Sequence, residues 1–178
     1  MIFNFSDTST SIGAALDGET TGTFNVDGIE ITATALIDEF NVTGSGFGIN
    51  QAASNDDTDA FDFTQDAPGP GVAEGFTLSF DQAVTLINFE VSSWNSGVDE
   101  VTLMDGATII ATISSTGINL LGNYSLGAFS PITVNTTAGS YGNGWSFDAI
   151  TVAAVPEPSL YGLIASACGI VLVTLRRR

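Results

Sequence analysis

Residues 23–36 read TFNVDGIEITATAL, and this stretch decides the fold class. Four apolar residues alternate with polar ones around the dipeptide Asp27-Gly28, namely Phe24, Val26, Ile29 and Ile31. An alternation with period two is typical of a strand that buries one face. Asp-Gly between two such runs is the strongest short signal for a β-hairpin. The stretch therefore predicts two antiparallel strands joined by a tight turn.

The same pattern recurs along the chain. A second Asp-Gly, Asp105-Gly106, separates strand-like runs at 101–104 and 108–113, and further strands are expected at 75–80, 83–91, 132–134 and 145–152. Within 83–91 the apolar phase changes near Leu86-Ile87, which predicts a β-bulge there. Short strands separated by Gly and Asn turns favour an all-β body over residues 1–154, a β-sandwich or jelly-roll-like fold.

The charge balance excludes several classes of function. The chain has 178 residues, with 20 acidic and three basic side chains, no histidine and a net charge of −17. All three basic residues are at the end, at 176–178. Nucleic-acid binding requires Lys or Arg on the body. Nucleophile pairs with His and His-ligated zinc require histidine. The composition therefore predicts no nucleic-acid partner, and the negative charge suits solubility and ion binding in an extracellular gel.

The C-terminal 24 residues differ from the body. Residues 155–159 read VPEPS, residues 160–175 read LYGLIASACGIVLVTL without a charge, and 176–178 are arginines. As a helix the apolar run would span about 24 Å, against about 30 Å for a bilayer core. Snorkelling arginines and local thinning can make up the difference. The pattern predicts one transmembrane helix over 160–175 with its arginines in the cytoplasm. The alternative is a buried C-terminal helix of a soluble domain.

These three parts, in this order and at the terminus, resemble the PEP-CTERM sorting signal of exosortase substrates, which are exported proteins of Gram-negative bacteria that make exopolysaccharide. The resemblance implies that a membrane-embedded exosortase-type enzyme recognises the motif Val155, Pro156, Glu157, Pro158 and Ser159. It also implies that Arg176, Arg177 and Arg178 stop and orient the helix in the inner membrane. Residues 46–49, 55–59, 75–81 and 145–152 are similar to the jelly-roll-like domains that many such proteins carry.

The resemblance implies an exported surface or extracellular-matrix protein. Its precursor would be bound to the membrane with the body outside the cytoplasm, and its role would be non-enzymatic binding or structure, with extracellular polysaccharide as a partner. Two alternatives are a polysaccharide hydrolase that uses Asp/Glu pairs and a protein that stays anchored in the membrane. Residues 1–13 lack the charged and apolar regions of a secretory signal peptide, so we expect an export signal upstream of Met1. The alternative is that the C-terminal segment inserts into the membrane by itself.

Acidic residues suggest calcium as a candidate cofactor. Asp56, Asp57, Asp59 and Asp62 lie close together in a loop-like stretch without a nearby cation. Calcium takes six to eight oxygen ligands from such groups, although the spacing does not match an EF-hand loop. The alternative is a solvated acidic loop.

Asp148 is a separate candidate. If Ile150 and Val152 face the core, Asp148 shares that face by the two-residue period. A carboxylate there needs a partner, and the body has no Lys or Arg. Asp148 would then either cap turn amides at a sheet edge or bind calcium with partners such as Asp17 or Glu19.

Three aromatic residues are candidates for sugar stacking, because an aromatic ring offers an apolar face with a polar tip. They are Trp94, Tyr141 and Trp145. The alternative is that these rings belong to the core, as aromatic residues of sandwiches usually do. A glycosidase would need two carboxylates flanking a cleft, and so acidic a chain gives no specific pair.

Overall fold

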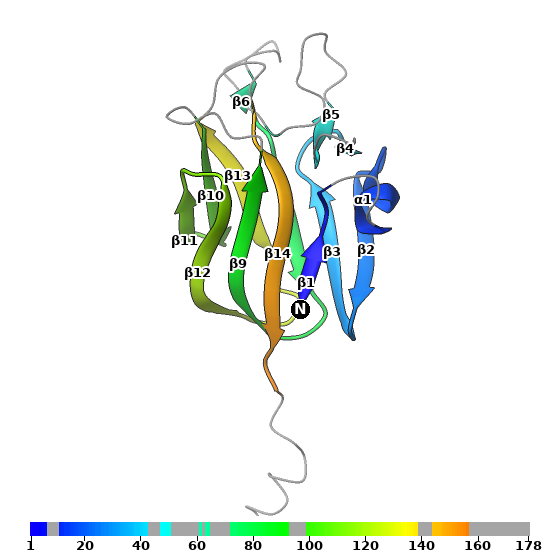
Figure 1. Ribbon diagram of the computed structural model, residues 1–178, viewed down its shortest axis with the longest axis vertical. Coiled ribbons are helices and arrows are strands. Elements are labelled where there is room, and N and C mark those ends of the chain that lie inside the picture. Colours follow the sequence, from blue (N-terminus) through cyan, green and yellow to red (C-terminus); the bar gives the residue numbers. More distant parts are fainter. Residues whose placement is uncertain are drawn as a thin grey trace, which may run out of the picture.

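The computed structural model of the chain is shown in Figure 1 and describes residues 1–6, 11–42, 47–50, 61, 63–64, 72–92, 99–138 and 144–156. Within these residues nearly all regular structure is antiparallel β-sheet, and the one helix is short, α1 (Ser11–Leu16). The predicted all-β class is therefore confirmed. No helix in this described part is long and apolar enough to cross a membrane, and residues 160–175 lie outside it.

Two larger sheets carry the architecture. The four-stranded sheet has the order β1 (Ile2–Asn4), β14 (Ser146–Ala154), β9 (Val84–Ser92) and β12 (Gly117–Leu126). The six-stranded sheet has the order β11 (Thr108–Ile113), β10 (Glu100–Asp105), β13 (Ile132–Ala138), β8 (Gly75–Phe80), β3 (Ile29–Ala35) and β2 (Thr21–Val26). Two short pairs complete the fold, β4 (Glu39–Val42) with β5 (Phe47–Asn50) and β6 (Phe63–Thr64) with β7 (Val72–Ala73).

Both predicted hairpins form. The pairing of β2 with β3 extends to Val26 opposite Ile29, so the loop between them is Asp27-Gly28. Both loop residues have positive φ values, 49° and 85°. Two positive φ values define a type I′ turn, whose twist matches that of the strands. The pairing of β10 with β11 extends to Asp105 opposite Thr108, and Gly106 in the turn between them has a φ of 57°.

The predicted bulge near Leu86-Ile87 is also present. Thr151 of β14 pairs with Asn88 of β9, whereas the next residue, Val152, pairs with Leu86, so Ile87 has no opposite residue. Along β9 the buried residues change phase at this point, from Val84 and Leu86 to Phe89 and Val91. The bulge lets both halves of a nine-residue strand direct apolar side chains into the core.

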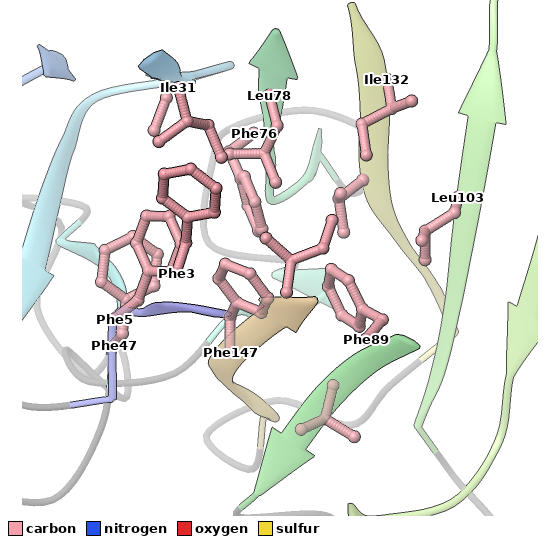
Figure 2. Packing of buried hydrophobic residues seen from close by; sticks show 14 of the residues in the cluster. Phe3, Phe5, Ile31, Phe47, Phe76, Leu78, Phe89, Leu103, Ile132 and Phe147 are labelled. Atoms are coloured by element: carbon pink, nitrogen blue, oxygen red, sulfur yellow. The ribbon is translucent and has the colours of Figure 1, made fainter. Parts of the chain in front are cut away.

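The core between the two sheets is rich in phenylalanine (Figure 2). Phe147 of β14 is fully buried and lies at its centre. Its ring stacks on Phe89 with a centroid separation of 4.5 Å and contacts Phe5 at 4.7 Å and Phe76 at 5.0 Å. Such ring pairs contribute about 0.5–1.5 kcal/mol each beyond the area that they bury.

Both ends of the described body lie at one end of the sandwich. β1 pairs antiparallel with β14, and the Met1 amine donates to the Val152 carbonyl at 3.0 Å. In Figure 1 the N-terminus and the end of β14 lie at the bottom, whereas β4, β5 and β6 lie at the top.

Candidate functional site

The predicted sorting motif begins where the last strand ends. β14 ends at Ala154, and the Val155 amide donates to the Ala83 carbonyl at 3.0 Å. Pro156 follows; it has no amide proton and cannot continue a strand ladder. Glu157, Pro158 and Ser159, like Arg176, Arg177 and Arg178, lie outside the described residues. The last strand of the described part therefore ends directly before the predicted motif, and the domain boundary itself stays a prediction.

Trp145 occupies the core and is fully buried. Its backbone forms an antiparallel bridge with Phe61, and its ring stacks on the Phe61 ring at 4.8 Å. The indole Nε1 donates to the Thr136 hydroxyl at 2.9 Å. This burial corrects the sugar-stacking prediction at Trp145, because neither face of the ring is left for a ligand. Trp94 and Tyr141 lie outside the described residues.

Asp148 lies in a bulge within β14. Phe147 pairs with Val91, but Ala149 pairs with Glu90, so Asp148 has no residue opposite it. The extra residue breaks the two-residue period, and Phe147 rather than Asp148 points into the core. Asp148 is half-buried, and its Oδ1 accepts a hydrogen bond of 2.7 Å from the Ser92 hydroxyl. The expected position on the same face as Ile150 and Val152 is therefore wrong, because the bulge shifts the register, and the hydrogen-bond partner is the Ser92 hydroxyl rather than a turn amide.

The partial burial of Asp148 raises the pKa of its carboxyl, and the hydrogen bond from Ser92 opposes this by favouring the charged form. A raised pKa means that the folded state prefers the protonated carboxyl. The stability that this preference contributes is fully present below the ordinary pKa of the carboxyl and is lost as pH rises through the raised one.

We therefore expect Asp148→Asn to remove one source of the pH dependence of folding stability. Relative to this variant, the wild-type chain should lose stability as pH rises from about 4 towards neutrality, because 4 is near the ordinary pKa of Asp. Ser92→Ala should raise the pKa of Asp148 further, since it removes the hydrogen bond to the charged form. Carboxyl NMR titration and denaturant unfolding at several pH values measure both effects. Ser92→Thr keeps a hydroxyl and is the control; equal pKa values in the wild type and Ser92→Ala would contradict the assignment.

No metal centre is assembled by the described residues. No group of three or more carboxylates converges among them, so Asp17 and Glu19 do not complete a site with Asp148. Asp17 instead accepts a hydrogen bond from the Val42 amide at 3.0 Å. The acidic stretch with Asp56, Asp57, Asp59 and Asp62 lies outside the described residues, and calcium binding there stays a prediction.

Two buried carboxylates were not anticipated from the sequence. Glu74 is fully buried directly before β8, and Asp99 is nearly so directly before β10. The Glu74 carbonyl accepts the Thr136 amide at 3.0 Å. Both residues flank β13, which runs between β8 and β10. An acidic residue that directly precedes an alternating apolar run is the only sequence signal, and it is too common to indicate burial.

Comparison with known proteins identifies no relative. The chain matches no protein-family model, no curated protein and no solved structure.

Proposed function

We propose that the chain is an exported surface or extracellular-matrix protein that a C-terminal PEP-CTERM-type signal directs to the inner membrane for processing. The observation that carries this proposal is the order of the last 24 residues: a Pro-Glu-Pro motif, an uncharged run over 160–175 and three terminal arginines. The arginines would remain in the cytoplasm and the acidic body would lie on the other side of the membrane.

The end of the body supports this proposal. Val155 is fixed to Ala83 by a backbone hydrogen bond, and Pro156 then stops the strand. Pro-Glu-Pro disfavours both helix and ladder, so it would present an extended segment next to the membrane. A processing enzyme could read such a segment without unfolding the sandwich. The apolar run would form the transmembrane helix of the precursor.

The proposed role of the delivered body is binding or structure rather than catalysis, with extracellular polysaccharide as the partner. The body resembles the jelly-roll-like domains that accompany such signals, and its negative charge suits a hydrated polymer gel. Incubation of the processed protein with polysaccharides separates this role from the alternative hydrolase. Retention without release of shorter sugars supports binding, whereas release of shorter sugars favours the hydrolase.

The sorting proposal is tested in an exosortase-containing bacterium, with the chain placed behind an export signal. Mass spectrometry of the mature protein should find a C-terminus upstream of Arg176. In the double variant Pro156→Ala/Pro158→Ala most of the protein should keep Arg178 and stay in the membrane fraction, because the recognition element is lost.

Pro131→Ala is the matched control, since Pro131 is an exposed proline outside the motif. This variant should be processed like the wild-type chain. Recovery of wild-type protein with Arg178 intact would exclude processing, and its retention in the membrane would then favour the permanently anchored alternative.

A further inference from the structure

The last strands of the two large sheets lie together on one side of the sandwich. β11 ends the six-stranded sheet and β12 ends the four-stranded one, and residues 114–116 join them (Figure 1, left). Large apolar side chains are exposed on both: Ile109 to 60%, Ile118 to 62% and Leu120 to 80%. Tyr124 of β12 donates to Asp105 at 2.9 Å, which ties β12 to the β10–β11 hairpin.

This side of the molecule also carries few charges, among them Glu90 of β9 and Asp105 of β10, whose carboxylate accepts the Tyr124 hydroxyl. No charged residue occurs from Gly106 to Phe147, a segment that contains β11, β12 and β13. The opposite side, formed by α1, β2 and β4, is flanked by Asp17, Glu19, Asp27 and Glu39. Two copies of a chain with a net charge of −17 repel each other. They can approach at a lower electrostatic cost through this side than through the opposite one.

The edge of β12 lacks the features that usually prevent edge-to-edge pairing. Natural edges carry lysine, proline, inward charges or bulges. Residues 117–121 of β12 contain neither a charge nor a proline. Two features interrupt this edge: Gly117 has a φ of 89°, and the register breaks between Leu120 and Tyr124, where Gly122 and Asn123 have φ values of 65° and 57°. They limit the regular part of the edge to residues 118–120.

We propose that this edge pairs with the same edge of a second copy of the chain, antiparallel and centred on Asn119. Gly117 on one side and the register break after Leu120 on the other bound the regular segment, so two such segments overlap fully only in this register. Ile118 then lies opposite Leu120 of the second copy, on the outer face of both sheets. Two four-stranded sheets become one sheet of eight strands, and main-chain hydrogen bonds supply the contact.

The nearest charges on this face do not oppose the pairing. Glu90 of β9 is the residue opposite Ile118. In the paired sheet, three strand spacings separate β9 from β9 of the second copy, or about 14 Å. The Debye length at physiological ionic strength is about 8 Å, so repulsion between the two Glu90 carboxylates is largely screened.

The proposal is tested by sedimentation equilibrium of the full chain in density-matched detergent. The wild type should form a dimer whose dissociation constant falls as salt rises, because salt screens the repulsion between the two copies. Ile118→Asp should weaken the dimer at least about tenfold, since it places a charge in the apolar contact. Ile2→Asp is the matched control: Ile2 is exposed to 60% on β1, at the other edge of the same sheet.

Ile2→Asp should dimerise like the wild type, and so should Ile109→Asp on β11. A wild type that stays monomeric at every concentration would overturn the proposal. A dimer that survives Ile118→Asp would also overturn the proposal. Association would then be driven by another part of the chain, such as the apolar run 160–175. A second readout is Ile118→Cys/Leu120→Cys in a Cys168→Ser background, which should give a covalent dimer on mild oxidation; its absence would contradict the proposed register.

Discussion

Replacing Phe147 with alanine is expected to lower the free energy of unfolding by about 3–5 kcal/mol, the usual range for deleting a buried aromatic ring. Phe147 is fully buried, and its ring contacts Phe5, Phe76 and Phe89. Phe76 belongs to β8, Phe89 belongs to β9 and Phe5 directly follows β1, so these rings come from both large sheets. The cavity would therefore lie where the two layers meet, and strands held by their hydrogen bonds can collapse only partly to fill it.

Denaturant unfolding followed by tryptophan fluorescence measures this loss, since Trp145 is buried in the same core. Phe129→Ala is the control: Phe129 is 74% exposed in a turn, so its removal should change stability by no more than about 0.5 kcal/mol. Equal effects of the two substitutions would show that Phe147 does not occupy the centre of the core.

Gly75→Ala is expected to be the second most damaging substitution, although it adds only one methyl group. Gly75 begins β8 and pairs with Asn135 of β13. A Cβ at this position would overlap the Val134 carbonyl oxygen and lie 2.9 Å from Asn135 Oδ1. Because the first of these atoms belongs to the backbone of a central strand, the strand itself must move. We expect a loss of about 3 kcal/mol, the upper end of the usual range for overpacking.

Gly127→Ala provides the comparison for this substitution. A Cβ at Gly127 would meet only the Ser130 hydroxyl, at 3.2 Å, and a hydroxyl at the surface can rotate away. Thermal unfolding should therefore show a clearly lower midpoint for Gly75→Ala and almost no change for Gly127→Ala. Similar midpoints in the two variants would mean that β8 and β13 are not as closely paired as described.

Local patterns predicted the hairpins and the bulge because their causes are local. Asp27-Gly28 selects its turn through the φ values that glycine and aspartate tolerate, and the phase change at Ile87 is visible in the order of apolar residues. β12 was not predicted. Its apolar residues Ile118 and Leu120 point outwards, so their alternation does not indicate a buried face.

The candidate site was less predictable because the side-chain positions depend on partners that are distant in sequence. Asp148 was expected to face inwards, but the bulge opposite Val91 and Glu90 turns it towards Ser92. Trp145 is buried because Phe61, far earlier in the chain, covers its ring. Neither partner can be recognised from the residues next to it in sequence. The end of the last strand near Ala154 could be predicted, since the composition changes there.

The antiparallel pairing of β1 with β14 has a consequence for how the body could be displayed. A reporter fused to Met1 would emerge beside Val155, because the Met1 amine donates a hydrogen bond to the Val152 carbonyl. Residues 155–159 can reach at most about 18 Å when fully extended. On a tethered precursor the end of the sandwich with the Asp27-Gly28 turn would thus stay close to the lipid headgroups (Figure 1). The opposite end, with β4, β5 and β6, would be the first part of the body that an incoming molecule meets.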